Sequence, residues 1–100
     1  MRYTLKNWQC FEIDSKEEWG RVRVFAGLLQ NGQFHVTGDI VEFDALTRVA
    51  GTSLGNDYVL SGEHGLTADA KDKWRCVCEK NGLTGLADVT DEIRKLMVPK

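Results

Sequence analysis

The stretch RVRVFAGLLQNGQFHVTGDIVEFD (residues 21–44) decides how this chain folds. Its first nine residues alternate between two sets of side chains, as expected of a strand with one buried face. Asn31-Gly32 follows, a pair that favours a type I′ hairpin turn because both residues tolerate positive φ. Residues 33–44 then form the returning strand, and Gly38 within it predicts a bulge or a sharp bend that curls the sheet.

The chain on either side of this hairpin is also rich in β-forming residues. Residues 3–13 are aromatic and apolar and contain neither Pro nor Gly, which favours a strand. Residues 46–52 and 57–62 are two more such runs, and the turn residues between them predict a second hairpin. A short helix over residues 15–19 is expected between the first two strands, with Trp19 against the core.

The last third of the chain changes to helical periodicity. Over residues 67–81, apolar side chains recur on the face expected to meet the core: Ala70, Trp74, Val77 and Cys78. Thr67 is expected to cap the start of this helix, and Gly82 to end it. Thr90 is expected to cap a second, short helix that Pro99 ends.

Strands therefore come first and helices last, with connections of hairpin length, which predicts an α+β fold. We expect a curled antiparallel sheet of about five strands without parallel pairs, a small half-barrel-like meander of the SH3 or OB shape. The long helix packs on this sheet, and the short terminal helix follows it. A chain of 100 residues, 42% of them apolar and 28% charged, is enough for a single domain spanning residues 1–100.

Several classes of protein are disfavoured by composition. No apolar run is long enough for a signal peptide or a membrane span. The three cysteines, Cys10, Cys76 and Cys78, are odd in number, and Cys76 and Cys78 lie too close together in a helix to pair. We therefore expect reduced thiols and a cytoplasmic protein that is not bound to a membrane.

The sequence does not show the spacing of a known phosphate-binding, zinc-binding or thiol-catalytic motif. The glycine-rich residues 47–65 have neither the spacing of a P-loop nor that of a dinucleotide fold, so they are interpreted as turns. The three cysteines, His35 and His64 lack the knuckle spacing of a zinc site. His64 lies about three helical turns from Cys76, too far for a nucleophile and its base. We expect no metal, no cofactor and no catalytic residue.

Eight residues are nevertheless candidates for a binding site. Trp8 and Trp19 have no periodic reason to be in the core, and aromatic residues are enriched in ligand pockets and partner surfaces as well as in cores. Arg21, Arg23 and Phe25 project from one face of a predicted strand. Arg48 and Tyr58 belong to the second predicted hairpin, and His64 follows it. The full set is Trp8, Trp19, Arg21, Arg23, Phe25, Arg48, Tyr58 and His64.

Three functions remain open on this sequence. The first is a non-enzymatic binding or adaptor module that takes a protein partner or a small ligand and forms a homodimer. The second is single-stranded nucleic-acid binding on the face of Arg21, Arg23 and Phe25; residues 36–69 oppose it, because they carry six acidic side chains and one basic one. The third is a small enzyme with a site around four residues: His35, His64, Asp39 and Glu42.

A resemblance to known proteins rests on four short stretches. FDALTRVAGTSLGNDYVLSG (residues 43–62) is followed by DAKDKW (69–74), NGL (81–83) and DVTDE (88–92). This pattern of turn residues and core aromatics resembles small proteins carried on bacterial mobile elements, of the gene-cassette or prophage kind. The resemblance implies a compact intracellular accessory protein, and it transfers no catalytic residue.

Overall fold

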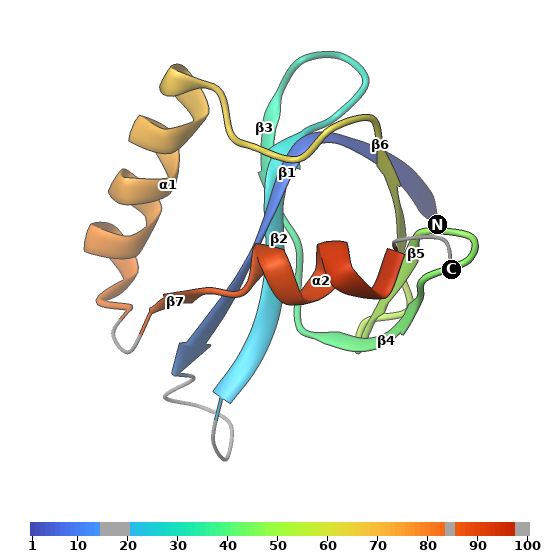
Figure 1. The fold of residues 1–100 in the computed structure, drawn as a ribbon. Coiled ribbons are helices and arrows are strands. Elements are labelled where there is room, and N and C mark those ends of the chain that lie inside the picture. Colours follow the sequence, from blue (N-terminus) through green and yellow to red (C-terminus); the bar gives the residue numbers. More distant parts are fainter. Residues whose placement is uncertain (15–20, 84–85, 98–100) are drawn as a thin grey trace.

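The computed structural model describes residues 1–14, 21–83 and 86–97, which form seven strands and two helices (Figure 1). The predicted helix over residues 15–19, Trp19 and Pro99 all lie outside the described residues. The elements in chain order are β1 (Arg2–Asp14), β2 (Arg21–Leu28), β3 (Phe34–Val36), β4 (Ile40–Asp44), β5 (Val49–Thr52), β6 (Asp57–Ser61), α1 (Ala68–Asn81), β7 (Ala87–Asp88) and α2 (Thr90–Met97).

The strands form one open, curled sheet in the order β3-β2-β1-β6-β5-β4, and β7 pairs with β1. β3 and β4 follow each other in the chain but lie at opposite ends of this order. The sheet must therefore curl until its two ends approach each other, as Figure 1 shows. The predicted α+β fold with a curled, mostly antiparallel sheet is confirmed, although it has seven strands instead of about five.

The expectation that the sheet holds no parallel pair is wrong. β1 and β6 pair in parallel, with Arg2 opposite Asp57 and Lys6 opposite Ser61. Connections of hairpin length predict antiparallel pairs, because a parallel pair usually needs a long crossover. In this fold the strands between β1 and β6 follow the curl of the sheet. β6 therefore pairs with the edge of β1 that faces away from β2.

The hairpin between β2 and β3 is confirmed, but its turn is not of type I′. Among the described residues other than glycine, only Asn7 and Arg48 have positive φ, so Asn31 does not have the conformation that a type I′ turn requires. The backbone N–H of Gly32 instead donates to the carbonyl of Leu29 at 2.8 Å, and Gly32 itself has a φ of 84°. This is a type I turn followed by a left-handed glycine, the usual three-residue hairpin loop.

The predicted bend in residues 33–44 separates β3 from β4. Thr37 is buried just before the bend, and its hydroxyl accepts a hydrogen bond from the backbone N–H of Phe25 at 3.0 Å. The N–H of Thr37 donates in turn to the carbonyl of Phe25 at 2.8 Å. After Gly38 the chain leaves β2, and β4 pairs with β5 at the other end of the sheet.

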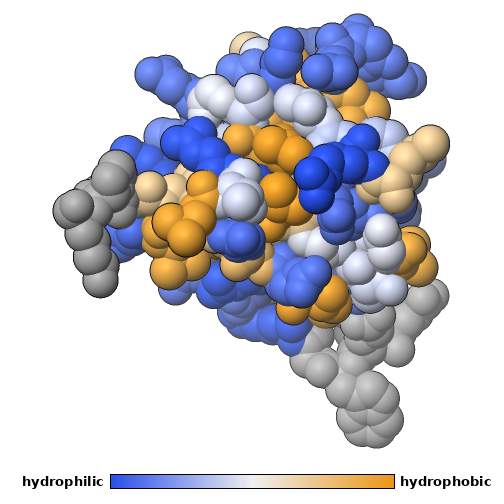
Figure 2. Space-filling model, turned by 90° about the vertical axis from the view of Figure 1, so that its right-hand side faces the viewer, coloured by the Kyte–Doolittle hydropathy of each residue, from blue (hydrophilic) through white to orange (hydrophobic). Residues whose placement is uncertain are grey.

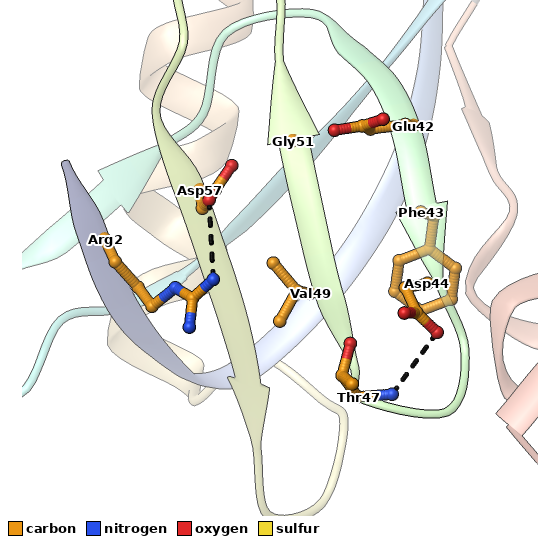
Figure 3. Close-up of a pocket in the computed structure, with 8 residues that line it drawn as sticks. All are labelled: Arg2, Glu42, Phe43, Asp44, Thr47, Val49, Gly51 and Asp57. Atoms are coloured by element: carbon orange, nitrogen blue, oxygen red, sulfur yellow. Dashed lines mark hydrogen bonds and ion pairs between the residues drawn. The ribbon is translucent and has the colours of Figure 1, made fainter.

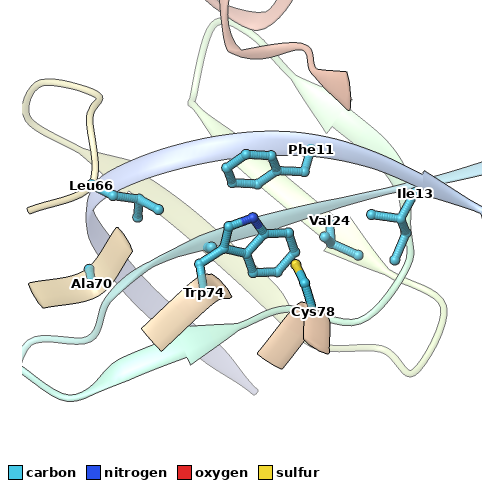
Figure 4. Packing of buried hydrophobic residues seen from close by; sticks show 8 residues of the cluster. Phe11, Ile13, Val24, Leu66, Ala70, Trp74 and Cys78 are labelled. Carbon is cyan, nitrogen blue, oxygen red and sulfur yellow. The ribbon is translucent and has the colours of Figure 1, made fainter. Parts of the chain in front are cut away.

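Two hydrophobic clusters lie on opposite faces of the sheet. α1 covers the outer face, where Trp74 stacks on Phe11 with ring centroids 4.5 Å apart (Figure 4). That outer cluster consists of Phe11, Ile13, Val24, Ala26, Leu66, Ala70, Trp74 and Cys78. The inner cluster lies within the curl, and α2 contributes Ile93 to it: Leu5, Trp8, Cys10, Phe25, Ala50, Leu60 and Ile93. Both faces of β1 and β2 are therefore buried.

The long helix begins and ends as the sequence predicts, but the short one begins differently. The hydroxyl of Thr67 accepts from the N–H of Ala70, and Gly82 ends α1 in the left-handed conformation. Thr90 does not cap α2: its hydroxyl accepts from the backbone N–H of Cys10 at 3.0 Å. A carboxylate oxygen of Asp88 accepts from the N–H of Thr90 instead. Asp88 therefore begins the turn that precedes α2, and Thr90 is the first residue of the helix. Neither described helix is long and apolar enough to cross a membrane.

Candidate functional site

A hollow of about 270 Å³ lies where α2, the turn between β4 and β5, and the connection from β6 to α1 meet. Seven residues from four separate segments line it: Trp8, Arg48, Gly62, Glu63, His64, Arg94 and Met97. Three of the eight residues predicted as binding residues are among them. The structure thus brings Trp8, Arg48 and His64 together from positions far apart in the chain.

Trp8 forms the inner wall of this hollow at an irregular point of β1. The pairing of β1 with β2 shifts register between Lys6 and Gln9, and Asn7 there has a φ of 48°. This irregularity places Trp8 in the inner cluster, where it is 1% exposed and meets the edge of Phe25 at 5.8 Å. Its indole Nε1 is buried and has no hydrogen-bond partner among the described residues. Such a group is uncommon in folded proteins.

The connection from β6 to α1 is held against β1 by two hydrogen bonds. The N–H of Gly65 donates to the carbonyl of Trp8, and the N–H of Leu66 donates to the side-chain oxygen of Gln9, both at 2.8 Å. Gly65 has a φ of 117°, which glycine adopts without strain. These bonds place the exposed imidazole of His64 beside Trp8, with ring centroids 5.9 Å apart.

Arg48 reaches the hollow from the turn between β4 and β5. Asp44 begins this turn, since its carboxylate accepts from the N–H of Leu46 at 3.0 Å. Arg48 ends it in the left-handed conformation with a φ of 60°, and its carbonyl accepts from the N–H of Leu60 at 2.9 Å. The side chain of Arg48 is exposed and makes no ion pair within the described part of the chain.

α2 supplies the remaining wall and is fixed by β1. Gln9 donates from its amide nitrogen to Asp88 at 2.9 Å, and Asp88 holds the first turn of α2. Arg94, one turn further along, pairs with Asp91 on its own helix at 2.9 Å. A second hollow of about 460 Å³ adjoins the first through His64, and it is lined by Gln9, His64, Gly65, Asp88, Thr90 and Asp91.

Tyr58, another predicted binding residue, belongs to the core. It is 3% exposed, and its phenol oxygen lies 2.8 Å from Nε2 of His35. Tyr3 stacks on Tyr58 with ring centroids 5.4 Å apart. Burial lowers the pKa of His35 and raises the pKa of Tyr58, so the pair is held in its neutral form.

The predicted face of Arg21, Arg23 and Phe25 is open at the two arginines but closed at Phe25. Phe25 is fully buried beneath α2, so its ring cannot stack on a base. Arg21 and Arg23 both pair with Glu12 at 3.3 Å, and their hydrogen bonds and charges lower the pKa of that carboxyl. Alternation identified the two faces of this strand correctly, but Phe25 on the second face lies in the inner cluster.

The four residues of the predicted enzyme site do not share one hollow. Glu42 lines a surface hollow of about 470 Å³ over β4, β5 and β6, where Gly51 leaves room for its side chain (Figure 3). His64 lines the hollow beside Trp8 instead, and His35 is bonded to Tyr58. Asp39 lies in the bend before β4, where its carbonyl accepts from Ser53.

Metal and thiol chemistry find no assembled site in residues 1–14, 21–83 and 86–97. No three side chains of His, Cys, Asp or Glu in these ranges lie close enough to hold a metal ion. Cys10 is buried, and this burial raises the pKa of its thiol to about 12, so it stays protonated at neutral pH. Cys76 is exposed on α1, and Cys78 faces the outer cluster.

Sequence reasoning missed Glu63, Arg94 and Met97 as lining residues. Arg94 and Met97 lie three residues apart on one side of α2, a spacing that the sequence shows, but nothing in the sequence places that side against residue 48. Comparison of the chain with protein-family models, with curated proteins and with solved structures gives no match. The assignment of this candidate site therefore depends on the geometry of its residues alone.

Proposed function

We propose that this protein is a small non-enzymatic binding module, and that the hollow beside Trp8 takes a small ligand or a side chain of a protein partner. The observation that carries this proposal is that side chains from four separate segments line one hollow. Trp8, Arg48, His64 and Arg94 come from four segments, and they line one hollow that combines an aromatic wall with polar groups. A few convergent polar groups around an apolar wall are typical of ligand sites.

The size of the hollow limits the ligand. Pockets for drug-sized ligands span roughly 300–1,000 Å³, and this hollow measures about 270 Å³. A single aromatic or branched group with one polar substituent fits such a volume, whereas a nucleotide or a longer peptide would extend beyond it into the adjoining hollow.

The two alternative functions have less support. Single-stranded nucleic-acid binding would need exposed aromatic rings beside free cations, but Phe25 is buried and both Arg21 and Arg23 are paired with acidic residues. An enzyme would need a nucleophile or an acid–base pair within hydrogen-bond reach. Glu42 and His64 line different hollows, so they do not form such a pair.

Three further expectations accompany the binding module as proposals. The first is that the curled sheet is a half-barrel of the SH3 or OB shape, closed on one side by α2; the position of Ile93 in the inner cluster supports it. The second is an origin on a bacterial mobile element, with a cytoplasmic location. The third is a homodimer, supported by exposed apolar side chains of the β4–β6 region and of α2: Val41, Leu46, Leu54 and Leu96. Figure 2 shows apolar patches on the side of the molecule that β4 to β6 form.

Nuclear magnetic resonance tests the binding module directly. A set of small organic compounds is titrated into the full chain, and the indole N–H signals of the tryptophans are followed. Trp8→Phe assigns the Trp8 signal, and Trp74, on the opposite face of the sheet, serves as the internal control. Binders should shift the signal of Trp8 and leave that of Trp74 in place. A set that shifts neither signal, or both equally, contradicts the proposal.

Size-exclusion chromatography with light scattering tests the homodimer separately. A dimer should weaken when Leu46 and Leu54 are both replaced by Ser, because these side chains are exposed and contribute little to the monomer's core. A protein that elutes as a monomer at high concentration contradicts this proposal and leaves the ligand site unaffected.

A further inference from the structure

Arg48 occupies a backbone position that does not suit an arginine. Its φ of 60° lies in the left-handed region, which L residues other than Asn and Asp rarely adopt. Glycine would make the same turn, including the hydrogen bond from Leu60 to the carbonyl of residue 48, without this strain. The geometry of the turn therefore does not account for an arginine here, and strained residues cluster where a side chain has a further task.

The guanidinium of Arg48 also has no acidic partner among the residues that the structure describes. The other five arginines each pair with a carboxylate: Arg2, Arg21, Arg23, Arg75 and Arg94. No acidic group in the described ranges lies within ion-pair distance of Arg48, although its side chain lines the hollow. Its donors are therefore free for an acceptor that enters from solvent.

Arg94 faces the same hollow from α2. Its partner Asp91 lies three residues away on the same exposed helix surface, and such a pair is weak enough for a ligand to replace. The lining carries two arginines and one carboxylate, that of Glu63, and Asp91 beside it offsets the charge of Arg94 until a ligand replaces it. The side chain of Met97 and the nearly buried ring of Trp8 form the apolar part of the same lining.

From these observations we infer that the hollow binds a small organic anion: a carboxylate or phosphate group on an apolar or aromatic body. Arg48 is the main anchor of the oxyanion, Arg94 is a second donor, and the body of the ligand packs on Trp8 and Met97. This inference rests on the proposed binding function and adds the chemical class of the ligand. Arginine suits the task, since its planar fork matches the oxygens of both groups.

Four probes test the inference on the full chain, with the indole signal of Trp8 as the readout. Benzoate and phenyl phosphate carry the two anionic groups on the same ring, benzamide is the neutral counterpart of benzoate, and inorganic phosphate lacks the ring. We expect at least one of the two aromatic anions to bind about tenfold more tightly than benzamide. Whichever of the two binds better identifies the oxyanion, and inorganic phosphate should bind more weakly than phenyl phosphate.

Variants of the two arginines separate recognition from folding. Arg48→Gly should weaken binding of the better anion about tenfold, while the variant stays folded because glycine suits the turn. Arg94→Gln should weaken binding as well. Arg75→Gln is its matched control, since Arg75 forms the same type of pair with Asp72 on α1 at 3.0 Å, away from the hollow.

The outcomes distinguish this inference from the proposed function. If neither aromatic anion binds more tightly than benzamide at Trp8, or if a folded Arg48→Gly protein binds the better anion unchanged, the inference of an anionic ligand is wrong while the proposed ligand site is not contradicted. If none of the four probes shifts the Trp8 signal, the anion site is wrong; if the wider set of compounds also fails there, the proposed function falls with it.

Discussion

Nε2 of His35 and the phenol oxygen of Tyr58 lie 2.8 Å apart and share a hydrogen bond, although 23 residues separate them in the chain. His35 belongs to β3 and Tyr58 to β6, two strands that are not neighbours in the sheet. The curl brings them together across the interior, and Tyr3 stacks against both rings. A polar pair thus holds one end of a sheet whose inner cluster is otherwise apolar.

This pair makes stability depend on pH. Burial lowers the pKa of His35 below its ordinary value of 6.5, so the folded protein binds this proton less readily than the unfolded chain. The stability linked to His35 is therefore present above pH 6.5 and is lost as the pH falls toward the folded-state pKa. Urea unfolding between about pH 7.5 and pH 5.5 should show a smaller loss of unfolding free energy for His35→Gln than for the wild type.

His64→Gln is the control for this measurement, because His64 is exposed and lies beside Trp8 instead of Tyr58. It should keep the pH dependence of the wild type. Equal slopes for His35→Gln and the wild type would show that His35 is not the group responsible.

Arg48→Gly should separate stability from binding. Removing a side chain from the left-handed region relieves strain of about 1 kcal/mol, but glycine also adds entropy to the unfolded chain. The unfolding free energy should therefore stay within about 1 kcal/mol of the wild type, which chemical denaturation measures. A loss of several kcal/mol would mean that the side chain of Arg48 has a structural role.

Trp8→Phe should destabilise the protein by roughly 1–2 kcal/mol, because the smaller ring leaves a cavity in the inner cluster. No hydrogen bond is lost in this change, since Nε1 of Trp8 has no partner in the described part of the chain. Thermal unfolding of the variant checks the magnitude. A loss well above this range would indicate a hydrogen bond that the indole makes in solution.

Gly27→Ala should be among the more costly single-methyl additions. A Cβ at position 27 would lie 2.7 Å from the carbonyl oxygen of Lys6 and 2.9 Å from Cγ of Leu5 on the neighbouring strand β1. Backbone atoms cannot move away as a flexible side chain can, so we expect a loss of about 1–3 kcal/mol in denaturant unfolding.

Gly38→Ala is the matched control for this substitution. Its φ is not positive, and a Cβ there would meet Thr52 and Leu54 only at 4.0 Å, which is ordinary contact. Its effect should stay within about 0.5 kcal/mol. Similar losses for the two variants would contradict the close approach of β1 and β2 at Gly27.

The local elements could be predicted because their signals are local. Both hairpins have turn residues between two β-prone runs, and α1 has its apolar spacing, Thr67 at its start and Gly82 at its end. The turn type at Asn31 could not be predicted in the same way, because a glycine preceded by Asn fits two hairpin loops that differ in which residues have positive φ.

The candidate site could be predicted only in part. Trp8, Arg48 and His64 were recognised by residue type, and they line one hollow in the structure. Phe25 and Tyr58 are candidates for the same reason, yet neither of them lines this hollow. Residue type shows which side chains are able to bind a ligand, but not which of them the fold brings to one hollow.

The sequence by itself determined the α+β class, the order of strands and helices, the bend at Gly38 and the limits of α1, since these depend on residues close together in the chain. Only the tertiary structure decided the parallel pairing of β1 with β6, the burial of both faces of β2, and the hollow beside Trp8. Alternation reveals that a strand has two faces. What covers each face depends on a curl that brings distant segments together, and no local pattern encodes that contact.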